Sequence, residues 1–126
     1  MDRRYGRSIA CAGVIFMISV VPGGSVPDVP IWNIDKFVHS LVYFWMTVFL
    51  YFDLCRAENH GLTRTLYTAV LLSLTYGGVL ELLQQSAIIN RTGSWSDFGA
   101  NGLGALLAAG FILLLNSNRH LQYFRK

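Results

Sequence analysis

Four apolar stretches alternate with polar segments along the chain, at about 8–21, 37–54, 65–89 and 98–115. A membrane-spanning helix needs roughly 20 mainly apolar residues, with a range of about 17 to 25. The last three stretches meet this length, whereas the first is short. All three prolines fall between the first two stretches, where they interrupt any helix. The pattern therefore predicts four helices in a single domain over residues 1–126.

The composition supports a membrane protein. Charged residues make up 13% of the chain, about half of the ~25% typical of a soluble domain, and 53% of the residues are hydrophobic. This balance excludes an intrinsically disordered chain and does not suit a soluble enzyme. The excess of 10 basic over 7 acidic residues forms no basic face, so we expect no nucleic-acid partner. The predicted fold class is an all-α, polytopic membrane bundle of four transmembrane helices. The composition is compatible with either a monomer or a homo-oligomer.

The basic residues predict the orientation of this bundle. Eight of the ten lie in the two termini and in the segment 55–64, whereas only Lys36 and Arg91 lie on the other side. Because basic residues favour the cytoplasmic side, both termini are expected in the cytoplasm, in a multi-pass protein of the cytoplasmic membrane. Cys11 and Cys55 then lie toward a reducing compartment, where free thiols are expected. A cleaved signal peptide is the alternative for the first stretch, although no clear cleavage site follows it.

Polar side chains converge at the extracytoplasmic ends of the last three predicted helices. The candidates are Asp35, Lys36, His39 and Tyr43; Glu81, Gln84 and Gln85; Arg91 in the loop; and Asp97 and Asn101 after Ser96 as the expected N-cap. A spacing of four residues places such side chains on one face of a helix. An ionisable residue inside a membrane span is costly, so it indicates a function unless a partner explains it. The opposite halves of the helices are almost entirely apolar, and Asp53 there is expected to be solvated.

These residue types suggest distinct chemical roles. His39, Glu81 and Asp97 are the candidate catalytic residues, because they can transfer protons. The candidate substrate-binding residues are Asp35, Lys36, Tyr43, Gln84, Arg91 and Asn101, among which Arg91 can hold a phosphate or carboxylate. His39, Glu81 and Asp97 could also supply metal ligands, but their spacing is not diagnostic, so neither a metal nor a cofactor is predicted. The small residues Ala100, Gly104 and Ala108 are expected to press the third and fourth helices together.

The order of these residues resembles a known family. Asp35-Lys36-x-x-His39-x-x-x-Tyr43, Glu81-x-x-Gln84 and Arg91-x5-Asp97-x3-Asn101-x2-Gly104 follow one another on consecutive helices. This set is similar to the VanZ-like family, which is named for an accessory factor in low-level teicoplanin resistance of Gram-positive bacteria. The resemblance implies a helical membrane protein of the cell envelope, with a link to glycopeptide resistance, but no mechanism.

Two functional hypotheses stay open. In the first, a polar pocket recognises the anionic head group of a membrane lipid or of a lipid-linked cell-wall precursor, with or without catalysis. In the second, the protein is a non-catalytic structural or scaffold protein whose polar residues only join the helices, since polar contacts between membrane helices are common.

Overall fold

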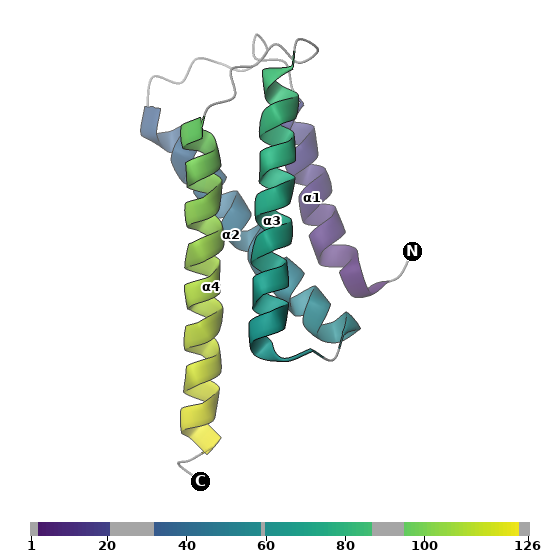
Figure 1. The fold of residues 1–126 in the computed structure, drawn as a ribbon, viewed down its shortest axis with the longest axis vertical. Helices are drawn as coiled ribbons and strands as arrows, with labels where there is room; N and C mark the ends of the chain where they lie inside the picture. The colour runs from purple at the N-terminus through teal and green to yellow at the C-terminus, as the bar shows by residue number, and fades with distance from the viewer. Residues whose placement is uncertain (1–2, 21–31, 59, 87–94, 124–126) are drawn as a thin grey trace.

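The computed structural model describes residues 3–20, 32–58, 60–86 and 95–123. Within these segments the chain folds into four α-helices after one short 3-10 turn, and they contain no strand. The elements are η1 (Arg3–Tyr5), α1 (Gly6–Ser19), α2 (Trp32–Ala57), α3 (Leu62–Gln85) and α4 (Trp95–Tyr123) (Figure 1). The predicted all-α fold class is therefore confirmed.

Three of these helices are long and apolar enough to cross a membrane. The qualifying segments are Lys36–Ala57, Leu62–Gln85 and Trp95–Arg119. The remaining helix, α1, has 14 residues and rises only ~21 Å, less than the ~30 Å hydrocarbon core of a bilayer. The third apolar stretch was expected to reach residue 89, but α3 ends at Gln85, where Ser86 becomes extended. Residues 87–89 lie outside the described residues.

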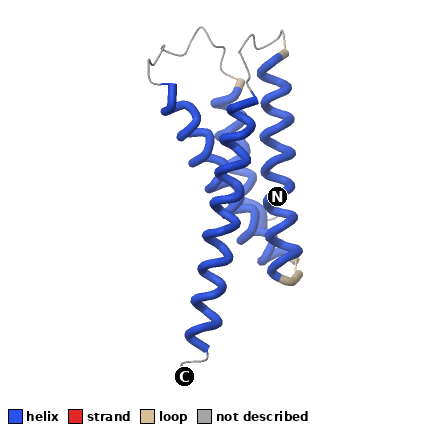
Figure 2. Tube along the Cα trace, turned by 60° about the vertical axis from the view of Figure 1, so that its left-hand side comes forward, coloured by secondary structure: helices blue, strands red, loops and turns tan. Residues whose placement is uncertain are grey.

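The helices alternate in direction, and α2 packs against all three of the others. Figure 1 shows α2 crossing the bundle diagonally behind α3, and Figure 2 shows α4 extending beyond the other helices at its C-terminal end. At one end of the bundle, α1 and α3 begin and α2 and α4 finish. We call this the basic end. It carries the exposed arginines Arg7, Arg56, Arg64 and Arg119.

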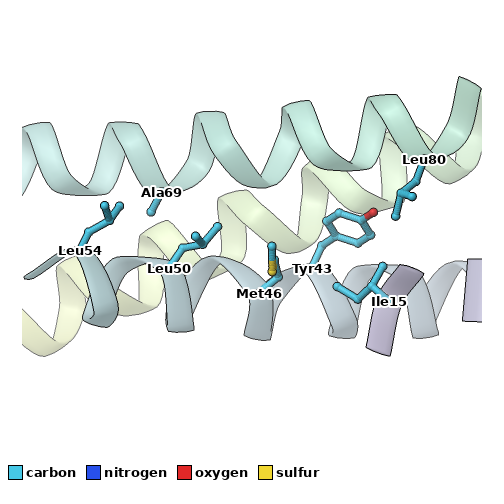
Figure 3. Close-up of a cluster of buried hydrophobic side chains, with 7 residues drawn as sticks. All are labelled: Ile15, Tyr43, Met46, Leu50, Leu54, Ala69 and Leu80. Atoms are coloured by element: carbon cyan, nitrogen blue, oxygen red, sulfur yellow. The ribbon is translucent and has the colours of Figure 1, made fainter. Parts of the chain in front are cut away.

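The apolar core lies where α2 meets α1 and α3 (Figure 3). The spacing of Tyr43, Met46, Leu50 and Leu54 places these four side chains on one face of α2, so that they can be buried together. Three further side chains complete the core: Ile15, Ala69 and Leu80.

Large apolar side chains also cover the outside of the bundle. Leu82 on α3 and Leu114 on α4 are 68% and 66% exposed. A soluble protein rarely leaves apolar surface exposed over so many positions, whereas in a bilayer it contacts lipid. The outward faces therefore agree with the apolar spans, and both indicate a membrane protein.

Small residues on α4 allow a close crossing with α2. Ala100, Gly104 and Ala108 are all buried. A Cβ atom added at Gly104 would overlap the Ser40 carbonyl oxygen and lie 3.0 Å from the Ser40 Cα atom. Gly104 thus packs on α2, and the prediction that this row presses α4 against α3 is wrong at Gly104. The α2 backbone crosses α4 at this position. The row of small residues alone does not specify which helix packs against it.

Candidate functional site

A cavity of about 80 Å³ lies among α1, α2 and α3 at the end of the bundle opposite the basic end. Hydrogen-bonding side chains from all three helices contribute to its wall, together with apolar side chains. The lining residues are Ile15, Ile18 and Ser19 of α1, Val38, His39, Val42 and Tyr43 of α2, and Gln84 of α3. We refer to it as the His39 cavity. It brings together three of the predicted site residues.

His39 is held in place by a side chain of α4. Its Nδ1 atom lies 3.1 Å from the Asn101 Oδ1 atom, and Asn101 is buried. Because an amide oxygen only accepts hydrogen bonds, Nδ1 donates in this contact. In the neutral imidazole, Nε2 then has the acceptor role, which is the form required of a general base. This hydrogen bond joins the starts of α2 and α4, the two helices that cross at Gly104.

Tyr43 is buried between α2 and α3, with its ring over a glycine of α3. A Cβ atom added at Gly77 would lie 2.9 Å from Tyr43 Cε1 and 3.2 Å from Asn101 Nδ2. Because Gly77 has no side chain, Tyr43 of α2 and Asn101 of α4 can both pack against α3 at this position. The Tyr43 hydroxyl points toward α3 (Figure 3) and interacts electrostatically with the buried Glu81 carboxyl group. Tyr43 thus lies near both Asn101 and Glu81.

Gln84 connects α3 to the end of α1. Its Nε2 atom donates a hydrogen bond to the Ser19 carbonyl oxygen at 3.2 Å, and both residues line the His39 cavity. The adjacent Gln85, expected on the same face as Glu81, is exposed instead. The buried residues Gly77, Leu80 and Gln84 are three and four positions apart, so they lie on one face of α3. Gln85 lies outside this face.

Other predicted site residues lie elsewhere. Lys36 and Asp97 are half-buried, and neither lines the His39 cavity. The side chain of Asp35 and the whole of Arg91 lie outside the described residues. Ser96 was expected to cap α4, but α4 already begins at Trp95. Within the part of the chain that the structure describes, no group of three or more His, Cys, Asp or Glu side chains could hold a metal ion.

The expectation that Asp53 is solvated is wrong. Asp53 is 1% exposed, and its Oδ2 atom accepts hydrogen bonds from the Ser8 backbone N–H at 2.9 Å and from Ser8 Oγ at 2.7 Å. Ser8 lies in the first turn of α1, where backbone N–H groups have no partner within the helix. Asp53 thus caps α1 from α2. The seven-residue step from Met46 to Asp53 on the buried face of α2 was the signal for its burial.

The sequence also did not predict a second polar contact to α1. The Tyr76 hydroxyl donates a hydrogen bond to the Ala12 carbonyl oxygen at 2.6 Å. With the contacts at Ser8 and Ser19, it fixes α1 to the bundle at its start, middle and end. The short first helix is therefore an integrated part of the fold. Cys11 on α1 is a half-buried free thiol, and Cys55 on α2 is an exposed one.

Comparison with known proteins gives one relative of uncharacterized function. The chain is 32% identical to an uncharacterized protein of Schizosaccharomyces pombe over 115 residues, which are 90% of this chain. It spans 65% of the length of that relative. No family model and no solved structure matches the sequence. The resemblance to the VanZ-like family thus stays a prediction from the residue pattern.

Proposed function

We propose that this protein is an integral protein of the cytoplasmic membrane that binds the polar head group of an amphiphile in the His39 cavity. The cavity itself carries the proposal, because hydrogen-bonding side chains of three helices meet in it. By the distribution of basic residues, the cavity faces the extracytoplasmic side and both termini face the cytoplasm. The resemblance of the residue pattern to the VanZ-like family supports a role in the cell envelope. It also supports a link to glycopeptide resistance.

The size of the cavity suits a small polar group. A volume of about 80 Å³ gives room for a small polar group. A carboxylate or a phosphate is such a group. The ligand we propose is therefore a membrane lipid or a lipid-linked cell-wall precursor. One polar portion of its head group enters the cavity.

Apolar side chains beside the polar ones favour an amphiphile over a soluble ligand. Ile18 of α1 and Val38 of α2 line the cavity and are still 56% and 45% exposed. In a bilayer these exposed surfaces contact hydrocarbon. A ligand bound beside them would place its apolar chain on α1 and α2 and its polar group against His39 and Gln84. Such a mixture of apolar wall and few polar groups is typical of ligand sites.

The anionic character of the head group is proposed from two basic residues. Lys36 lies one turn before His39 on α2, and Arg91 belongs to the segment between α3 and α4. They are the basic residues that the sequence places on this side of the membrane. A guanidinium group binds a phosphate or carboxylate through two parallel hydrogen bonds, so Arg91 is the proposed anion ligand.

Catalysis is the second candidate, and the hydrogen bond between His39 and Asn101 favours it. An imidazole at the wall of a cavity, with Nδ1 donating to Asn101 and Nε2 left as the acceptor, can act as a general base. Glu81 and Asp97 would be further proton-carrying groups. In this case His39→Gln would abolish turnover and leave binding largely unchanged, whereas a pure binding protein would show no turnover of the bound amphiphile.

Native mass spectrometry of the gently extracted protein tests the proposal. Val42→Phe would fill the cavity without changing a polar group, and Val79→Phe on the exposed face of α3 is its matched control. We expect the wild type and Val79→Phe to retain a specific amphiphile that Val42→Phe loses. Equal retention by both variants, or no specific amphiphile on the wild type, would favour the alternative in which the polar residues only join the helices.

A further inference from the structure

A second cavity lies at the basic end, between the last turns of α2 and α4. It has a volume of about 180 Å³. The lining residues are Tyr51, Phe52 and Cys55 of α2 and Ile112, Leu115, Asn116 and Arg119 of α4. The apolar spans in these two helices end at Ala57 and Arg119. This Arg119 cavity therefore lies where the helices leave the hydrocarbon, at the depth of the lipid head groups.

One wall of the Arg119 cavity is rich in hydrogen-bond donors. Arg119 contributes a guanidinium group and Asn116 an amide, while the Tyr51 hydroxyl interacts with both the Cys55 thiol and Arg119. Among the described residues Arg119 forms no ion pair, so none of them supplies a counter-ion for its charge. A guanidinium group is the side chain best suited to bind a phosphate, because its fork matches two phosphate oxygens.

The other wall is apolar and faces the bilayer. Phe52 on α2 and Leu115 on α4 border the cavity, and Leu115 is 40% exposed. A soluble phosphate would gain nothing from these side chains, whereas the acyl chain of a lipid would cover them. The exposed Arg56, which follows the lining residue Cys55 on α2, repels a head group that carries an additional cation. Both features favour a lipid with net negative charge.

We propose that the Arg119 cavity binds the phosphate of an anionic phospholipid, with the phosphate on Arg119 and Asn116 and one acyl chain along Phe52 and Leu115. By the distribution of basic residues this lipid belongs to the cytoplasmic leaflet. The site is independent of the His39 cavity, because the two lie at opposite ends of the bundle and share no lining residue.

The affinity for phosphatidylglycerol tests this site. The detergent-solubilised full-length protein is titrated with phosphatidylglycerol or with phosphatidylcholine, and bound lipid is counted by native mass spectrometry. Arg119→Gln should weaken phosphatidylglycerol binding about tenfold, as expected for the loss of hydrogen bonds to a charged group. Arg64→Gln removes the same charge from the basic end outside the cavity, so it should bind as the wild type does. An equal loss in both variants would overturn the proposal, because binding would then follow overall charge.

Labelling of Cys55 tests the site without altering the proposed phosphate ligands. In a Cys11→Ser background, Cys55 is the remaining thiol, and it is exposed in the Arg119 cavity. We expect phosphatidylglycerol to slow its reaction with a maleimide several-fold and phosphatidylcholine to have little effect. If glycerol 3-phosphate slows the reaction as strongly as phosphatidylglycerol does, the ligand is a soluble phosphate and the assignment to a lipid fails. Unchanged labelling with every addition would overturn the site itself.

Discussion

The two ends of the bundle use buried polar groups in different ways. At the basic end, the Asp53 carboxylate accepts two hydrogen bonds from Ser8 and is enclosed within the protein. At the opposite end, hydrogen bonds from His39 and Gln84 also join helices, but both side chains line a cavity. An ionisable group inside a span therefore does not by itself mark a functional site. Access to a cavity separates the two cases.

The contact of Asp53 has a clear structural role. The start of an α-helix carries a partial positive charge and backbone N–H groups without partners in the helix. A carboxylate placed there satisfies one of these groups and neutralises the charge. Because α1 is too short to span a bilayer by its length alone, its contacts with α2 and α3 are what hold it in the bundle.

The largest effect in this comparison is expected from Asp53→Ala. The substitution leaves the N–H and hydroxyl groups of Ser8 buried without their acceptor, which should lower the free energy of unfolding by about 3 kcal/mol. Unfolding by SDS in mixed micelles measures this change. Amphiphile retention per folded molecule should stay as in the wild type. A loss of retention at unchanged stability would assign Asp53 to the binding function instead.

Gly104→Ala tests the crossing of α2 and α4. The added methyl group would meet the Ser40 backbone, which cannot turn aside, so we expect a loss of about 2 kcal/mol in the same assay. Gly110→Ala on the same helix places its methyl group in open space and is the matched control. Equal stability of the two variants would mean that the helices do not cross at Gly104.

Gln84→Leu should affect both properties, because Gln84 joins α3 to α1 and also lines the His39 cavity. We expect a loss of about 1 kcal/mol in unfolding free energy, within the range for hydrogen bonds between membrane helices, together with weaker amphiphile retention. Gln85→Leu changes an exposed glutamine at the adjacent position and should alter neither. A stability loss without any change in retention would leave Gln84 a purely structural role.

The smallest effect is expected from Tyr76→Phe. It removes only the hydroxyl that donates to the Ala12 carbonyl oxygen, so the unfolding free energy should fall by about 0.6 kcal/mol. Tyr67→Phe on the same helix, where the side chain is 69% exposed, serves as the control and should be neutral. If both substitutions cost the same, the contact between Tyr76 and α1 contributes nothing measurable.

Much of the fold could be predicted from hydrophobic periodicity, because helix length and apolar content are local properties. The convergence of His39, Tyr43, Gln84 and Asn101 at one end also followed from their positions along each helix. What could not be predicted was the order of helices around the bundle. Gly104 indicated a close contact but not its partner, since a small residue accommodates any backbone.

The contact between Asp53 and Ser8 shows a second limit of the sequence. The two residues lie 45 positions apart, and neither residue type favours burial on its own. The partners of Tyr76 and Gln84 are backbone carbonyl oxygens, which every residue carries. No pattern of side chains could reveal these contacts before α1 was placed. The cavities likewise depend on how side chains of several helices fill the space between them.

The most direct test of a head-group site in the His39 cavity is nitrogen NMR of the histidine side chains. Protein labelled with ¹⁵N-histidine is delipidated, and the amphiphile that co-purifies with the wild type is then added back. Since His39 lines the cavity and His60 is exposed near the basic end, we expect the ring nitrogens of His39 to shift and those of His60 to stay unchanged. Unchanged His39 signals at a saturating concentration would contradict the site.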